Sequence, residues 1–359
     1  MDNTKNYFYG IDFLRWFAAF GVVLYHYSLH FKVEEVNYSS FLNFLILNRD
    51  FAQQFVWLFW AISGFVFTNI YVHRETNLKN FFISRFARLY PLHFITLIIV
   101  MILQFISIKK FGYSQEGYIN DLYHFILNIF FASDWGLQSN WNYNVPVWSV
   151  SIEIPIYFLF FFTLFYLKKF KLVFSIFIAL SCYYLFPSLE NLNLNQWQRL
   201  AIFNFKTCIF YFFSGSCVYF IYLKLENYRK LLFSIGLFFI LISIVFLNFK
   251  FNLLILDLFP STIILILSLI LFFACFDYIF KDYAKSIYLL SNTSYSIYLL
   301  HFPLQLLILI ICEEYSFSLE NFVNIFYFLA FLIILQIMAL ISFLYFETPM
   351  RRYLNSKYK

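Results

Sequence analysis

An arginine and a histidine lie eleven residues apart in the first hydrophobic segment, at Arg15 and His26. Ionisable side chains inside an apolar span are costly, and by default they indicate function. Eleven residues at about 100° each make roughly three full helical turns, so both side chains share one face about 16 Å apart along the axis. This face offers a cation at one depth and, at another, an imidazole able to act as general base toward a hydroxyl. The spacing suits a long anionic ligand.

A structural alternative exists for the same residues. Asp12 precedes Arg15 by three positions, so the two can form an ion pair on one helix face. His26 would then be an interfacial histidine.

Two further segments carry small or basic residues at helical spacing. Ser63 and Gly64 permit close helix approach, which either forms a packing notch or admits a narrow chain beside the backbone. Arg85 and Arg88 share a face at the start of another apolar segment. They predict either a clamp for phosphates, which arginine binds through paired donors, or an anchor at the inner membrane surface.

A carboxylate and a third polar cluster complete the candidates. Trp148 and Ser149 precede Glu153 in an apolar segment, where a carboxylate needs a partner or a proton. Glu153 is predicted either to orient His26 and stabilise its protonated form or to be a hydrogen-bonded structural residue. His301 lies mid-segment near a proline and is equally consistent with a structural and a site-lining role.

Several kinds of site are excluded. The chain has no HExxH motif, no His/Cys cluster, no Walker A loop, no GxGxxG and no GxSxG, so no metal is predicted. The five cysteines lie in apolar stretches without CxxC spacing and are interpreted as small buried hydrophobes.

Composition sets the fold class. The 359 residues are 62% hydrophobic and 12% charged, with a mean hydropathy of +0.74. These values exclude a soluble domain and predict an all-α, polytopic integral membrane bundle. Ten transmembrane helices are expected near 8–28, 51–71, 90–108, 146–167, 170–187, 200–223, 231–248, 259–277, 288–312 and 321–346. A shorter amphipathic piece near 119–133 is expected to be interfacial or re-entrant.

The basic residues predict the orientation. With ten spans, 17 Lys and Arg fall on the side of the termini and 6 on the other. The six are Lys32, Arg49, Lys109, Lys110, Arg199 and Lys250. The positive-inside rule then places both termini in the cytoplasm. Residues 1–359 are expected to form a single integral domain without an appended soluble domain, with His26 and Glu153 together in the outer half.

Taken together, these segments resemble the membrane-bound acyltransferase-3 family from about residue 8 to 353. Its members typically read D-x-L-R…H, F-x-x-S-G-F, R-x-x-R-x-x-P, W-S-x-x-x-E, S-Y-x-x-Y-L-x-H and E-x-P, in that order. The corresponding residues here are Asp12, Leu14, Arg15, His26, Ser63, Gly64, Phe65, Arg85, Arg88, Pro91, Trp148, Ser149, Glu153, Ser294, Tyr295, Tyr298, Leu299, His301, Glu347 and Pro349.

The resemblance implies a bacterial cytoplasmic-membrane O-acyltransferase with ten spans. It would move acetyl from cytoplasmic acetyl-CoA, or another acyl-CoA, to a hydroxyl of a cell-surface or lipid-linked saccharide. The implied partners are the acyl-CoA donor, the saccharide acceptor and the lipid bilayer, with no metal and no nucleic acid.

The resemblance also implies roles for single residues. His26 resembles the catalytic histidine, Glu153 the acidic residue of the fourth motif and Arg15 the partner arginine of the first span. Arg85 and Arg88 resemble the donor-binding pair. We expect Ser63 and Gly64 beside the donor, and Trp148, Ser149 and His301 beside the acceptor.

A transporter or flippase of a lipid-linked sugar is the competing class, because intramembrane charges and ten spans suit it equally well. No inverted repeat or matching pair of broken helices favours it. The acceptor and the oligomeric state stay open at this point.

Overall fold

The computed structural model describes residues 7–31, 51–72, 76–166, 171–185, 193–250, 258–280 and 288–358. These residues form helices and loops, with no strand among them. The long helices are α1 (Tyr9–His30), α3 (Ala52–Tyr71), α4 (Leu78–Phe111), α6 (Trp148–Tyr166), α7 (Lys171–Leu185), α8 (Gln196–Lys224), α9 (Arg229–Lys250), α10 (Leu258–Ile279), α13 (Ser294–Glu314) and α14 (Ile325–Ile341). Shorter pieces are α5 (Leu122–Ile129), α12 (Tyr288–Ser291), the π-helical turn η8 (Ser342–Glu347) and α15 (Thr348–Tyr358).

Within the described ranges, eight helices are long and apolar enough to cross a membrane. The two segments that account for the difference from the predicted ten are α1 and α7. Helix α1 carries Asp12, Arg15 and two histidines, which lower its hydropathy, and α7 is only 15 residues long. The all-helical class is confirmed, and the membrane character rests on these eight helices.

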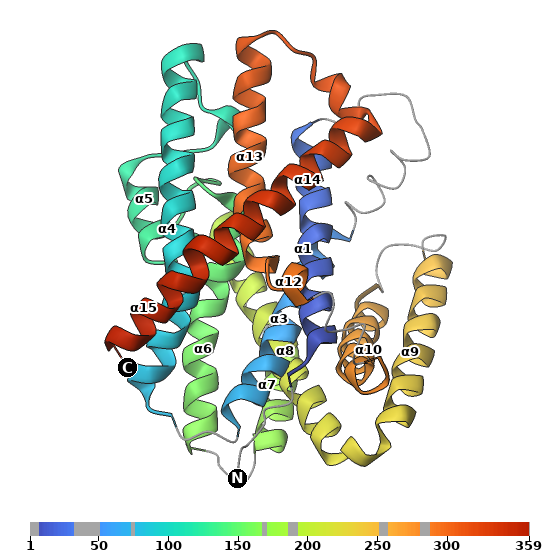
Figure 1. Cartoon of the computed structure of the whole chain (residues 1–359). Helices are drawn as coiled ribbons and strands as arrows, with labels where there is room; N and C mark the ends of the chain where they lie inside the picture. Colours follow the sequence, from blue (N-terminus) through green and yellow to red (C-terminus); the bar gives the residue numbers. More distant parts are fainter. Residues whose placement is uncertain are drawn as a thin grey trace.

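Helices α1, α4 and α13 stand side by side and run in the same direction (Figure 1). Helix α14 crosses them obliquely and continues through η8 into α15, and α9 and α10 form a hairpin on the other flank of α1. Helix α1 therefore lies inside the bundle, where its polar side chains can face other helices.

The amphipathic piece predicted near 119–133 contains the eight-residue helix α5. Eight residues rise only about 12 Å, which is too short to span a bilayer. Leu122, Ile126 and Phe130 are exposed along one side of it, whereas His124 and Asn128 are buried. The piece is therefore no additional span, and its exposed apolar side suits the membrane interface.

The residues between α5 and α6 enter the bundle. Asn144 is 1% exposed and donates from Nδ2 to the carbonyl of Leu299 in α13 at 3.1 Å. Pro146 and Val147 are buried, and α6 begins directly after them. Consequently α6 occupies only part of the bundle height that α4 covers (Figure 1).

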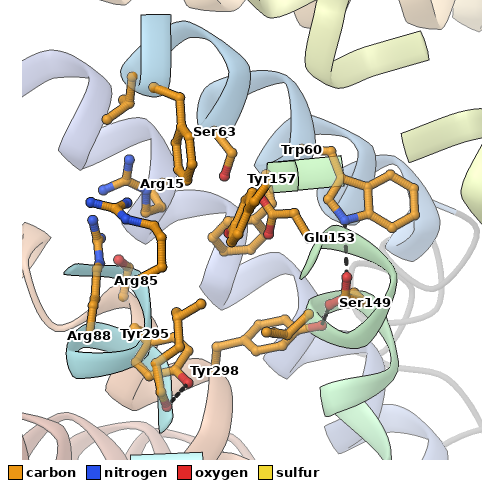
Figure 2. A pocket seen from close by; sticks show the side chains of 16 residues that line it. Arg15, Trp60, Ser63, Arg85, Arg88, Ser149, Glu153, Tyr157, Tyr295 and Tyr298 are labelled. Atoms are coloured by element: carbon orange, nitrogen blue, oxygen red, sulfur yellow. Dashed lines mark hydrogen bonds between the residues drawn. The ribbon is translucent and has the colours of Figure 1, made fainter. Parts of the chain in front are cut away.

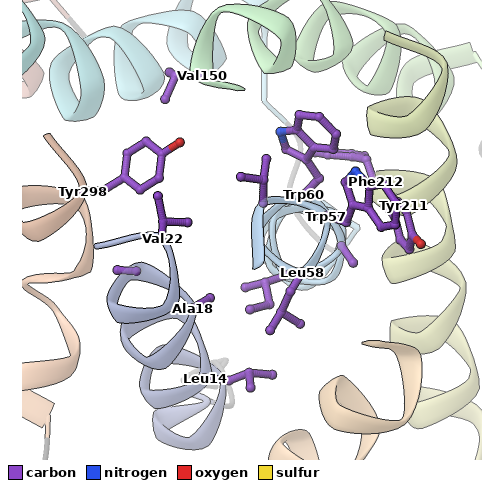
Figure 3. Close-up of a cluster of buried hydrophobic side chains, with 14 of the residues drawn as sticks. Leu14, Ala18, Val22, Trp57, Leu58, Trp60, Val150, Tyr211, Phe212 and Tyr298 are labelled. Atoms are coloured by element: carbon purple, nitrogen blue, oxygen red, sulfur yellow. The ribbon is translucent and has the colours of Figure 1, made fainter. Parts of the chain in front are cut away.

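The core between α1, α3 and α8 is built from side chains of all three helices (Figure 3). Leu14, Ala18 and Val22 line one face of α1 and are at most 3% exposed. On the opposite side of α3, Trp57 stacks on Tyr211 of α8, with ring centroids 5.3 Å apart.

Two glycines allow α3 and α8 to touch through their backbones. A Cβ atom on Gly64 would lie 1.7 Å from the Phe212 carbonyl oxygen, and one on Gly215 would lie 1.9 Å from the Ala61 carbonyl oxygen. Ser216 donates its hydroxyl to the Gly64 carbonyl at 3.2 Å. Because lipid tails are as apolar as leucine, helices in a membrane associate through such close packing rather than through the hydrophobic effect.

We expect Gly215→Ala to force α3 and α8 apart and to lower the stability by at least the ~1–3 kcal/mol typical of overpacking. The readout is the thermal midpoint of the purified protein in detergent. Gly236→Ala serves as the control, because its Cβ would lie no closer than 3.1 Å to an atom of Phe272. An unchanged midpoint for Gly215→Ala would contradict the backbone contact.

Candidate active site

Helix α1 brings Arg15 and His26 to two different cavities. The helix is continuous over Tyr9–His30, so the predicted spacing of three turns is present. Arg15 lines one cavity and His26 lines another. One helix face therefore connects the two.

The first cavity, which we call the arginine cavity, has a volume of about 80 Å³. Its lining comes from α1, α3, α4, α6 and α13. Figure 2 shows its polar side chains, which gather three guanidinium groups on one side and a carboxylate on the other. These side chains are Arg15, Ser63, Arg85, Arg88, Ser149, Glu153, Tyr157, Tyr295 and Tyr298.

The guanidinium groups are only partly compensated. Arg15 pairs with Asp12 at 2.8 Å, which confirms the predicted ion pair without removing Arg15 from the cavity. Arg85 lies over the Phe67 ring at 4.6 Å, and its Nε is buried without a hydrogen-bond partner. A buried charged donor without a partner is costly. The arrangement therefore favours an anionic ligand that accepts from Arg85.

Glu153 lies in the arginine cavity rather than beside His26. Its carboxylate interacts with the hydroxyls of Ser63 and Tyr157 and with the charges of Arg15 and Arg88. His26 does not line this cavity, so the expected support of its imidazole by Glu153 has no counterpart in the cavity linings.

The second cavity, which we call the aromatic cavity, is larger, at about 400 Å³. His26 lines it together with five aromatic side chains and two amides. These are Tyr25, Tyr118, Trp141, Trp148, Tyr298, Gln53 and Asn204. The lining combines flat apolar ring faces with hydrogen-bonding groups, as small-molecule sites commonly do.

The two cavities meet at Tyr298, which lines both. Its hydroxyl lies 2.7 Å from Ser149 Oγ and donates to the Pro146 carbonyl at 2.9 Å. Trp148 lines the aromatic cavity, and its neighbour Ser149 lines the arginine cavity. A hydrogen-bonded pair thus forms the boundary between them.

The ring neighbours of His26 are Tyr25 and two other histidines. The rings of His301 and His30 lie 5.1 Å and 5.6 Å from it between centroids. His30 Nδ1 lies 3.1 Å from a Glu116 carboxylate oxygen, and His26 Nδ1 is buried without a hydrogen-bond partner. Among the described residues, no three His, Cys, Asp or Glu are arranged to hold a metal ion. His26 is therefore a buried imidazole with a free nitrogen.

A third, smaller cavity of about 30 Å³ adjoins the arginine cavity. Arg88 and Tyr295 line both this cavity and the arginine cavity, and Glu347 and Arg351 line it too. Glu347 accepts hydrogen bonds from the hydroxyls of Ser296 and Ser342. The three cavities therefore follow one another from the start of α15 to His26.

The structure brings most of the predicted residues to these cavities. Gly64 is an exception, because it faces the backbone of α8 and does not line the arginine cavity. His301 contacts His26 but lines neither of the two main cavities.

Several cavity residues were assigned no role from the sequence. Tyr157 follows Glu153 by four residues, a spacing that carried a signal, and Tyr295 and Tyr298 were named only as members of the fifth motif. No pattern in the sequence pointed to Trp141 or Asn204. Trp141 lies in a loop and Asn204 lies on α8, and both are far from His26 in the chain.

The segment before α6 is held by a buried carboxylate. Asp134 accepts from Asn204 Nδ2 at 2.7 Å and from Gln138 Nε2 at 2.8 Å, and its backbone N–H donates to Ser151 Oγ at 3.1 Å. Burial raises the pKa of Asp134 to about 7, although the two amide donors oppose the shift. This network ties the entering segment to α6 and α8.

The raised pKa predicts how stability depends on pH. The folded state favours protonated Asp134, so this contribution is full below the unfolded pKa of about 3.9 and is lost as pH rises to about 7. Between pH 5 and 8 we expect wild type to lose about 2 to 3 kcal/mol relative to Asp134→Asn. Thermal midpoints in detergent at both pH values measure this.

Glu226→Gln is the control for that measurement. Glu226 is exposed, and its partner is Arg229 rather than a histidine. The difference between wild type and Glu226→Gln should not change between pH 5 and 8. A constant difference for Asp134→Asn as well would show that Asp134 does not titrate there.

One comparison with known proteins identifies the family of the chain. A family model described as an acyltransferase domain matches residues 8–347, nearly the whole chain. No curated protein and no solved structure matches. The match includes every residue that lines the arginine and aromatic cavities. The chain belongs to the acyltransferase-3 family of membrane acyltransferases.

Proposed function

We propose that the protein is an O-acyltransferase that moves acetyl from acetyl-CoA to a hydroxyl of a cell-surface or lipid-linked saccharide. The observation that carries this proposal is the meeting of two chemically different cavities at Tyr298. One cavity is cationic and the other is aromatic with a histidine. Such a pair suits an anionic donor and a neutral acceptor that approach from opposite sides.

The donor would bind along the arginine cavity and the third cavity that adjoins it. Its phosphates fit Arg85 and Arg88, with Arg351 in the adjoining cavity, because arginine binds phosphate through paired donors. The unpartnered Arg85 Nε supports this fit. The pantetheine arm would pass Arg15 and Ser63, and the pair of Ser149 and Tyr298 must give way for the thioester to reach His26.

The chemistry at His26 is a direct transfer. The imidazole removes the proton from the acceptor hydroxyl, and the oxygen attacks the thioester carbonyl carbon. The carbon–sulfur bond breaks, and the leaving thiolate takes the proton to give free CoA. Glu153 does not touch His26 in this scheme; it balances the arginine charges and holds them in place.

The acceptor would occupy the aromatic cavity. Trp141, Trp148 and Tyr298 offer ring faces that suit the apolar faces of a sugar, and Gln53 and Asn204 offer hydrogen bonds. The positive-inside asymmetry supports a cytoplasmic donor side and an acceptor arriving from the outer face. We assign the protein to a bacterial cytoplasmic membrane on the same grounds.

The first prediction concerns His26. Surface glycans of cells carrying wild type should show an ester mass increase of roughly 42 daltons by mass spectrometry, and cells with His26→Ala or an empty vector should not. Protein levels are checked in parallel. His124→Gln, a histidine outside both main cavities, should retain the signal. Equal acetylation by His26→Ala would refute the catalytic assignment.

A cell-free assay separates the transferase from a transporter. Purified protein should release free CoA from acetyl-CoA in proportion to the acceptor modified. Vesicles in which the protein moves a labelled lipid-linked sugar without releasing CoA would instead support a flippase.

The second prediction concerns the donor site. Arg88→Gln should raise the KM for acetyl-CoA about tenfold to a hundredfold, the loss expected for a charge-assisted hydrogen bond, and leave the KM for the acceptor nearly unchanged. Arg352→Gln is the control, because Arg352 is exposed on α15. A rise in the acceptor KM alone would place the donor elsewhere.

A further inference from the structure

Asn204 is a polar wall residue of the aromatic cavity. It lies on α8, is 2% exposed and lines the cavity together with His26. Leu200, one turn earlier on α8, lines the same wall. Helix α8 therefore presents one amide and one apolar side chain to whatever enters.

The orientation of the Asn204 amide follows from its partner. The NH₂ group of Asn204 faces Asp134, because Asn204 Nδ2 donates to Asp134 Oδ2 at 2.7 Å. The other Asp134 oxygen accepts from Gln138. Both carboxylate oxygens are thus occupied by amide donors, and the Asn204 carbonyl must point away from Asp134.

Among the described residues, the Asn204 side chain makes one hydrogen bond, from Nδ2 to Asp134, and no donor is bonded to its Oδ1, while the side chain lines the aromatic cavity. The supporting segment is rigid, because the Asp134 backbone N–H donates to Ser151 Oγ and Trp135 Nε1 donates to the Ser151 carbonyl. A fixed acceptor group is therefore aimed into the cavity that holds His26.

We propose that Asn204 determines acceptor specificity by accepting a hydrogen bond from the acceptor, and that Asp134 is the positioning residue that fixes its orientation. This inference rests on the proposed function. It requires that the acceptor carry a second donor, a hydroxyl or an amide N–H, besides the hydroxyl that is acylated. Polyhydroxylated rings meet this requirement, and simple monohydroxyl lipid alcohols do not.

The test uses the purified full chain with acetyl-CoA and methyl glycosides of common hexoses and N-acetylhexosamines, each with its monodeoxy analogues. Free CoA is measured. Asn204→Ala should lower kcat/KM for the glycoside about tenfold to a hundredfold, the cost of leaving a donor unpaired, with the KM for acetyl-CoA unchanged. Leu200→Ala is the matched control for cavity shape and should show a smaller loss.

One deoxy analogue should erase the difference. The analogue that lacks the hydroxyl or N–H bound by Asn204 should react equally with wild type and Asn204→Ala, because the interaction is then absent from both. Asp134→Asn, which keeps the shape of the side chain, should alter the ranking of the analogues, because its amide lets Asn204 turn over. It also keeps the test valid if Asn204→Ala does not fold.

The outcomes separate the two proposals. Wild type that releases no CoA with any glycoside would overturn the proposed function and this inference with it. Active wild type with an unchanged Asn204→Ala, or a loss that no single analogue erases, would overturn the role of Asn204 alone. An unchanged ranking for Asp134→Asn would overturn the positioning role of Asp134.

Discussion

The partial burial of three guanidinium groups among apolar helices is the constraint on which the rest of this structure depends. Charges inside a membrane protein need partners, and removing one partner of a buried charge is severely destabilising. Here Arg15 forms an ion pair with Asp12 and interacts with the charge of Glu153. Arg85 lies over the Phe67 ring, and its Nε is buried without a hydrogen-bond partner. Such an incompletely compensated cluster supports the proposed anion site, and side chains from five helices line it.

The close crossing of α3 and α8 provides part of that support. Gly64 and Gly215 bring the two backbones into contact, and Ser216 adds a hydrogen bond across the crossing. The neighbouring Ser63 then faces the arginine cavity. Trp60 of the same helix donates to the Ser149 carbonyl at 3.3 Å, so the crossing is linked to the boundary between the cavities. Helix α3 therefore both packs against α8 and contributes to the lining of the arginine cavity.

The segment that enters the bundle before α6 positions part of the site. Its polar backbone groups are tolerated inside the bundle because protein groups satisfy them, as Asn144 and Leu299 illustrate. It places Ser149 against Tyr298 and anchors Asp134 to Asn204. Glu153 and His26 line different cavities, and the ring neighbours of His26 are Tyr25, His30 and His301.

The sequence alone determined the helical class, the approximate positions of the long helices, the shared face of Arg15 and His26, and the Asp12–Arg15 pair, because all of these depend on hydropathy and on spacing within one helix. Tertiary structure alone decided which cavity receives each side chain. Glu153 lines the arginine cavity, Gly64 faces the backbone of α8, and Asn204 lines the same cavity as His26. These placements depend on where the helices begin and cross. Periodicity reports the face of a helix, whereas the depth and partner of that face are set by loops and contacts between residues far apart in the chain.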